Sequence, residues 1–213
     1  MDDYSAIFKR RSFHKFAEAE ALTAEDVEGL EAFIRTLKPL EDRFHPVIRV
    51  MPLSATTCHN GGSHAVVFYD DKQGDYLRNV GYMGEQIDLY LASRNIGCCW
   101  FGLASPLEKT AEGKPYVILL SVGKVSEGDF REDMFKAARK PLEEKWTGDV
   151  LQGKDYSVAE IARYAPSACN TQPWFTESLD RKLTVYRMRK PGPDGIMPSS
   201  SGPDGNRHLR SPR

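Results

Sequence analysis

The sequence lacks a long apolar run, an excess of one charge and a signal peptide. No stretch approaches the ~18 uninterrupted apolar residues of a membrane-spanning helix. The formal net charge is −1, which leaves no basic excess for nucleic acid and no charged block for a membrane surface. Met1 to Tyr4 is acidic, unlike a signal peptide. We therefore expect a soluble, cytoplasmic protein that binds neither nucleic acid nor membrane.

Cysteine is scarce, and its spacing excludes the common zinc sites. The chain has four cysteines: Cys58, Cys98, Cys99 and Cys169. They match no zinc pattern, and a bond between the neighbours Cys98 and Cys99 would be a strained vicinal disulfide. Buried reduced thiols are the expectation, because free Cys packs as a small hydrophobe. His59 and His64, five residues apart, also fit no ligand pattern, so we expect no metal.

The 213 residues, 40% of them hydrophobic, are enough for one globular domain. Apolar periodicity predicts helices over 4–11, 23–38, 75–95 and 158–164, and strands over 46–51, 64–69, 116–122 and 183–188. Thr23 followed by Asp26 predicts a capping box. Because helices and strands mix without strict alternation, we expect an α+β fold with a central mixed or antiparallel sheet flanked by helices.

The longest periodic stretch, 75–95, contains two glycines that weaken a helix. Gly81 and Gly84 each cost ~1 kcal/mol against Ala, so we expect a close packing partner there. Gly97 is expected to end this helix as its C-cap residue.

The composition changes at Pro191. The 23 residues 191–213 include five Pro, four Gly and four Ser, which cannot offset their ordering entropy by burial. We therefore expect one domain over 1–190 and a disordered tail over 191–213.

Two polar motifs carry candidate chemistry. Arg10, Arg11 and Ser12 offer two guanidinium forks and a hydroxyl, a set suited to a phosphate group.

The second motif is Ala-Pro-Ser-Ala-Cys-Asn-Thr-Gln-Pro-Trp at 165–174. It places Ser167, Asn170 and Gln172 between Pro166 and Pro173, which stiffen the backbone. An Asn and a Gln held in this way can donate and accept along the edge of a planar heteroaromatic ring.

These motifs, with Ile-Gly-Cys-Cys-Trp at 96–100 and Arg-Lys-Pro-Leu at 139–142, resemble the FMN-dependent nitroreductase family over nearly all of residues 4–190. The Pro-Ser motif follows Arg-Arg-Ser by about 150 residues. That order resembles a subfamily in which one chain holds two half-units and mimics the usual homodimer. The resemblance implies a nitroreductase-like, pseudo-dimeric fold with half-units of about 1–145 and 146–190.

The resemblance also implies an FMN site between segments 9–12 and 166–172. Hydride would pass from NAD(P)H through the flavin to a nitro compound, quinone or similar small-molecule acceptor, without a side-chain nucleophile. The residues that would contact the cofactor are Arg10, Arg11, Ser12, Gly97, Cys98, Pro166, Ser167, Asn170 and Gln172.

The resemblance ends after about Met188, where members of the subfamily continue with a helix-containing segment. We therefore expect an incomplete second half-unit, and a non-catalytic flavin-binding or flavin-less remnant is the alternative function. A thiol-based redox protein using Cys98 and Cys99 is a third. The internal half-units favour a monomer, whereas an uncovered apolar face would favour weak homo-oligomers.

Overall fold

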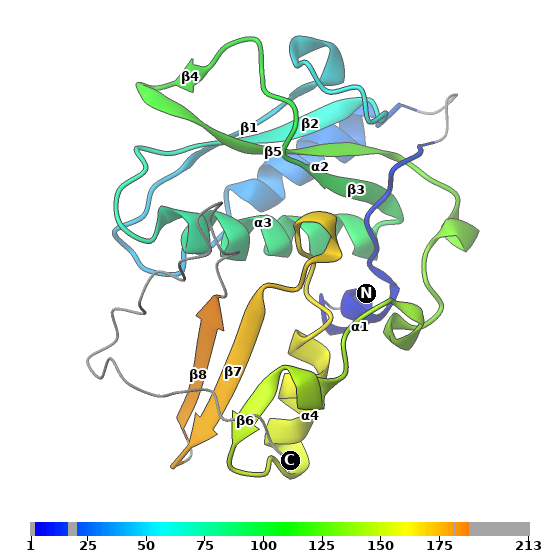
Figure 1. Cartoon of the computed structure of the whole chain (residues 1–213). Coiled ribbons are helices and arrows are strands. Elements are labelled where there is room, and N and C mark those ends of the chain that lie inside the picture. The colour runs from blue at the N-terminus through cyan, green and yellow to red at the C-terminus, as the bar shows by residue number, and fades with distance from the viewer. Residues whose placement is uncertain (1–2, 17–20, 181, 188–213) are drawn as a thin grey trace, which may run out of the picture. The chain divides into compact units, whose positions relative to one another are not determined.

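The computed structural model describes residues 3–16, 21–180 and 182–187. The chain divides into two compact units, Met1–Ala137 and Ala138–Arg213, which we call unit 1 and unit 2. The expected α+β class is confirmed, because helices flank sheets that are largely antiparallel (Figure 1). The expected tail, 191–213, lies outside the described residues, and the expected half-units stay a prediction.

Unit 1 is built on one sheet with the strand order β1-β2-β5-β3, and β4 pairs with β5. Each of these pairings is antiparallel. The elements of the unit are α1 (Asp3–Lys9), α2 (Ala24–Ile34), β1 (Val47–Pro52), η1 (Leu53–Ala55), β2 (His64–Tyr69), α3 (Tyr76–Ser93), β3 (Ile96–Phe101), β4 (Thr110–Ala111), β5 (Lys114–Lys124), η2 (Glu127–Asp129) and η3 (Met134–Lys136).

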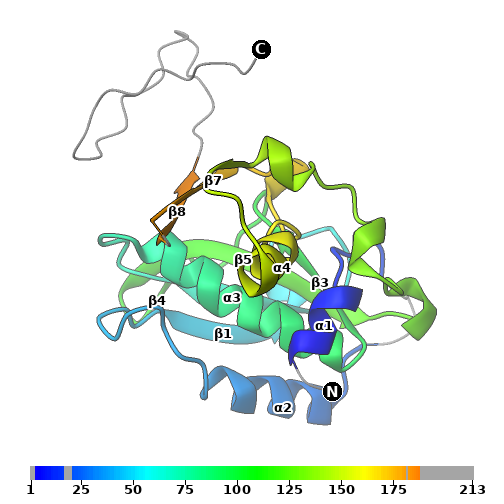
Figure 2. The same cartoon turned by 90° about the horizontal axis from the view of Figure 1, so that it is seen from below.

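The core of unit 1 lies between this sheet and two helices. Helices α2 and α3 cover the same face of the sheet (Figure 1), where Val66 and Leu120 meet Leu30 of α2 and Ile87 of α3 in one cluster. Strand β2 is almost entirely buried because its His-Ala-Val-Val-Phe-Tyr run is apolar on both faces. Helix α1 packs against α3 (Figure 2). Burial of both faces explains why β2 was predictable from its sequence.

The two glycines of α3 differ in their surroundings. A Cβ at Gly84 would lie 2.3 Å from the ring of Trp100 on β3, so α3 approaches the sheet closely at this point. A Cβ at Gly81 would meet no described atom within 4 Å. The expected close partner therefore exists at Gly84 and not at Gly81.

The expectation that Gly97 caps α3 is wrong. Helix α3 ends at Ser93, and Asn95 takes the left-handed conformation with φ 59°, which Asn tolerates better than most residues. Gly97 instead lies in β3 opposite Gly123. The capping box of Thr23 and Asp26 at the start of α2 is confirmed.

Unit 2 has a three-stranded sheet in which β6 runs parallel to β7 and β7 antiparallel to β8 (Figure 1). Gly148 in β6 has φ 97°, and a Cβ there would lie 1.9 Å from the carbonyl oxygen of Ser178, so this contact requires glycine. The elements are η4 (Leu142–Glu144), β6 (Trp146–Gly148), α4 (Gly153–Ala162), η5 (Ala168–Asn170), β7 (Trp174–Leu179) and β8 (Lys182–Arg187).

Among the described residues, none of the helices combines the length and the apolar character that crossing a bilayer requires.

Candidate functional site

The predicted site residues fall into two groups, one in each unit. In unit 1, Arg10 follows α1, and its side chain is 5% exposed. Its Nη1 donates to Oδ2 of Asp88 at 2.6 Å, and Asp88 on α3 is 1% exposed. Trp100 Nε1 donates to the same oxygen at 3.2 Å. Burial opposes the charge of Arg10, but Asp88 and then Glu85 outweigh it, so the pKa of Arg10 is raised. The guanidinium is therefore anchored to α3 as a buried ion pair.

Glu85 is a third charged residue at this place, and together with Arg10 and Asp88 it forms the charged cluster of unit 1. Its Oε1 lies 4.0 Å from Nε of Arg10, and its side chain is 31% exposed. Burial and the neighbouring Asp88 raise the pKa of Glu85 to about 7, while Arg10 acts in the opposite direction. A carboxyl group that titrates near neutrality thus lies beside the Arg10–Asp88 pair.

The remaining predicted residues of unit 1 are adjacent to one another. Ser12 forms a parallel bridge with Cys98, and the Phe13 N–H donates to the Cys98 carbonyl at 3.0 Å. A Cβ at Gly97 would lie 2.6 Å from Val125, so glycine allows this close packing. The segment after α1 therefore runs along β3.

Arg11 differs from Arg10 in its exposure. Its side chain is exposed, and Nη1 donates to the Asp129 carbonyl at 2.9 Å. A guanidinium carries five N–H donors, and the bond to Asp129 uses one of them.

The cysteines are free thiols, as predicted, but one of them is not buried. Cys58, Cys98 and Cys99 are buried, whereas Cys169 is exposed. Burial raises the pKa of Cys98 well above its ordinary value, and burial followed by Asp88 raises that of Cys99 to about 11. Since the thiolate is the reactive form, this chemistry disfavours a redox role for the Cys98–Cys99 pair. Cys169 is exposed because it lies in the loop of the second motif.

In unit 2, the motif forms an exposed loop with an unusual backbone. Cys169, Asn170 and Gln172 have φ of 50°, 52° and 48°. The left-handed region costs a residue other than glycine roughly 1–2 kcal/mol, and Asn bears this cost best. Three such residues within four positions need support from their surroundings.

Gln172 is the inner support of this loop, and it is buried. Its Oε1 accepts from the Lys140 N–H at 2.8 Å. Its Nε2 donates to the carbonyl and side-chain oxygens of Asn170 at 3.2 and 3.3 Å. Its backbone N–H donates to Ser167 Oγ at 2.9 Å, and its carbonyl accepts from Lys145 Nζ at 2.6 Å. The polar groups of Gln172 are thus used within unit 2.

Asn170 is tied to the start of the unit. Its Nδ2 donates to the Ala138 carbonyl at 2.9 Å, and its Oδ1 accepts from Nη1 of Arg139 at 2.9 Å. Nη2 of Arg139 also donates to the Tyr164 carbonyl at 3.1 Å. Pro166 and Ser167 are partly exposed at the entrance to the loop.

Sequence reasoning missed three residues of these clusters. Asp88 gave no signal, because a carboxylate on a helix is usually solvated. Arg139 and Lys145 lie in or beside the Arg-Lys-Pro-Leu element, but nothing in the sequence linked them to the loop about 30 residues later. Burial of Lys145, followed by the nearby Lys140, lowers the pKa of Lys145.

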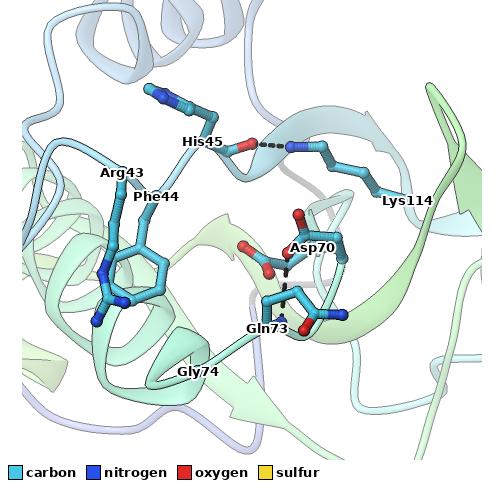
Figure 3. A pocket seen from close by; sticks show the side chains of 8 residues that line it. Arg43, Phe44, His45, Asp70, Gln73, Gly74 and Lys114 are labelled. Carbon is cyan, nitrogen blue, oxygen red and sulfur yellow. Dashed lines mark hydrogen bonds between the residues drawn. The ribbon is translucent and has the colours of Figure 1, made fainter.

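Unit 1 also has a small pocket, which Figure 3 shows from close by. Its volume is about 120 Å³, below the ~300 Å³ at which ligand pockets begin. Lys114 Nζ donates to the His45 carbonyl, and the Lys72 N–H donates to Asp70 at 2.9 Å. None of the predicted site residues lines it. The lining residues are Arg43, Phe44, His45, Asp70, Asp71, Gln73, Gly74 and Lys114.

Within the part of the chain that the structure describes, no group of three or more His, Cys, Asp or Glu side chains is placed to hold a metal ion.

One family model matches most of the chain. The family model described as "Putative TM nitroreductase" matches residues 2–192. No curated protein matches the chain.

Three solved structures share the fold. A putative nitroreductase from Thermotoga maritima has a TM-score of 0.60 at 22% identity, over 88% of this chain and 76% of that chain. A nitroreductase family protein from Clostridium difficile 630 has a TM-score of 0.52 at 14% identity, over 68% and 96%. A nitroreductase-like family protein from Bacillus cereus has a TM-score of 0.50 at 14% identity, over 72% and 97%.

Proposed function

Because the chain belongs to the putative TM nitroreductase family, we propose that it is an FMN-dependent oxidoreductase that transfers hydride from NAD(P)H to a small-molecule acceptor. A nitro compound or a quinone is the acceptor class that the family suggests. The observation that carries the proposal is the match over residues 2–192, which includes both the Arg-Arg-Ser segment and the Pro-Ser motif.

The donor set of unit 1 fits a phosphate group. Arg11 is exposed and retains free N–H donors beyond its bond to Asp129, and Ser12 adds a hydroxyl beside it. Guanidinium and hydroxyl groups together are typical phosphate ligands. Arg10 already has Asp88 as its partner, so we assign it to the anchoring of this segment. Gly97 and Cys98 on β3 lie next to Ser12 and would line this part of the site.

The 166–172 loop of unit 2 fits the planar ring of FMN and the polar ribityl chain that the ring carries. Pro166 and Ser167 are partly exposed, and residues 168–171 are exposed along the loop. Backbone groups fixed in such a loop can hydrogen-bond the edge of a heteroaromatic ring. Asn170 and Gln172 fix the shape of that loop through their internal bonds.

Bound FMN would supply the hydride chemistry, accepting from the nicotinamide and donating to the acceptor. The chain would supply binding and orientation. Arg11 and Ser12 would hold the phosphate, and the 166–172 loop would hold the ring edge. Glu85, with its pKa of about 7, could exchange a proton with solvent near neutrality beside the Arg10 anchor.

The test is turnover by the purified chain. We expect NADH or NADPH to be oxidised in the presence of FMN and a quinone or nitroaromatic, with little oxidation when either FMN or the acceptor is left out. Binding of FMN without any turnover would favour the non-catalytic flavin-binding alternative. Failure to bind FMN would overturn the proposed cofactor.

A further inference from the structure

We propose that Arg139 is a positioning residue that holds the 167–172 loop in a conformation ready for the cofactor. The proposal rests on the proposed FMN function. It adds that Asn170 and Gln172 act as an internal brace of the loop, and that the buried Gln172 side chain is not a group that contacts the cofactor.

First, the backbone conformation of the 167–172 loop needs support from residues outside the loop. Cys169, Asn170 and Gln172 all have left-handed backbones, a conformation that residues other than glycine keep only when the surroundings enforce it. The short helix η5 and a Thr171 side chain bonded to the Ala168 carbonyl at 3.0 Å are the local supports. Local contacts of this kind form one turn and do not tie it to the rest of the unit.

The second step is that the external support converges on one segment, 138–145. Asn170 bonds the Ala138 carbonyl and Arg139, and Gln172 bonds Lys140 and Lys145. The Arg139 side chain bonds two places at once, since its two terminal nitrogens donate to Asn170 Oδ1 and to the Tyr164 carbonyl. A planar guanidinium can bridge such a pair, whereas a single ammonium cannot match the fork.

The third step is that Gln172 has little hydrogen-bonding capacity left for a ligand, and that Asn170 uses its oxygen and one N–H within unit 2. Both N–H donors of the Gln172 amide and its oxygen are used within the loop and by Lys140. The oxygen of Asn170 accepts from Arg139 and from Gln172. Their contribution to binding would therefore be preorganisation, which strengthens affinity by removing the ordering cost.

The experiment compares the full-length wild type with Arg139→Gln and Arg139→Lys. Hydrogen exchange of the 167–172 amides is measured in the free protein, and the FMN dissociation constant is measured by fluorescence. We expect Arg139→Gln to speed exchange in this loop and to raise the dissociation constant about tenfold, because the free loop loses its preorganised shape. Arg139→Lys should lie between wild type and Arg139→Gln, since one ammonium can keep one of the two contacts.

The matched control is Arg78→Gln, which removes an exposed guanidinium paired with exposed Asp75 in unit 1. It should change neither measurement. Unchanged exchange in Arg139→Gln would overturn the positioning role, as would faster exchange with wild-type FMN affinity. If Arg139→Gln does not fold, the same comparison is made with Arg139→Lys. If the wild type binds no FMN, the proposed function fails, and the exchange data alone decide whether Arg139 holds the loop.

Discussion

At the residue scale, the Arg10–Asp88 pair is the strongest polar contact of unit 1. The two residues are 78 positions apart and almost fully buried. The sequence marked Arg10 as a cation for a ligand, and no local pattern could identify its partner, because the contact is created by the packing of α1 on α3.

Removal of the Asp88 charge should destabilise the fold. In Asp88→Asn, the Arg10 guanidinium stays buried without its counter-charge, and breaking such a pair typically costs about 3 kcal/mol or more. Urea unfolding measures the loss. The control is Asp75→Asn, which disrupts an exposed pair with Arg78 and should cost less than about 1 kcal/mol. Equal losses of stability in the two variants would show that the buried Arg10–Asp88 pair contributes no more to stability than the exposed pair.

Glu85 should make stability depend on pH. Its pKa is raised by burial from the ordinary 4.5 to about 7. Between these values the folded state keeps a proton that the unfolded state releases, so stability falls as the pH rises through this window. Above pH about 7 the Glu85 carboxyl is ionised in both the folded and the unfolded state, so the free energy of unfolding falls no further through this group.

Glu85→Gln lacks this titration, so its stability relative to wild type should rise across the same window. Urea unfolding at a series of pH values provides the measurement. Glu28→Gln, a change at an exposed position of α2, is the matched control. If both variants show the same pH trend, the assignment to Glu85 is wrong.

At the element scale, α3 shows how one residue type can have two roles. Gly84→Ala would push a Cβ into the Trp100 ring, and overpacking of this kind costs typically 1–3 kcal/mol. Gly81→Ala has open space around its Cβ and should gain up to about 1 kcal/mol of helix propensity. Thermal unfolding of the two variants should therefore shift in opposite directions. A gain in stability at Gly84 would contradict the close packing of α3 on β3.

Elements with a strong apolar pattern were predictable from the sequence. The expected strand 64–69 coincides with β2, and the expected helix 75–95 is α3 with slightly shorter ends. Strands β3 and β7 were not predicted. β3 carries Gly97 and two cysteines, and β7 alternates apolar and polar residues weakly. Strand β3 is stabilised by pairing with β5, and β7 by pairing with β6 and β8. Such long-range pairing leaves no local signal in the sequence.

At the scale of the whole molecule, the motif residues could be found from sequence, and their assignment to a cofactor stays a prediction. The order of the motifs led to the family that the comparison then identified over residues 2–192. Sequence patterns assigned Asn170 and Gln172 to the cofactor, because amides suit a ring edge. The structure gives both side chains partners within unit 2, which only tertiary packing could determine.

The visible absorption spectrum of the purified protein is the first measurement to make, because it reports whether the chain binds FMN. The protein is mixed with FMN, passed through gel filtration and scanned. We expect flavin absorption that elutes with the protein in a near-stoichiometric amount, and weaker retention in Arg139→Gln. A folded wild-type protein that elutes without flavin absorption after saturation with FMN would show that the chain is not an FMN protein.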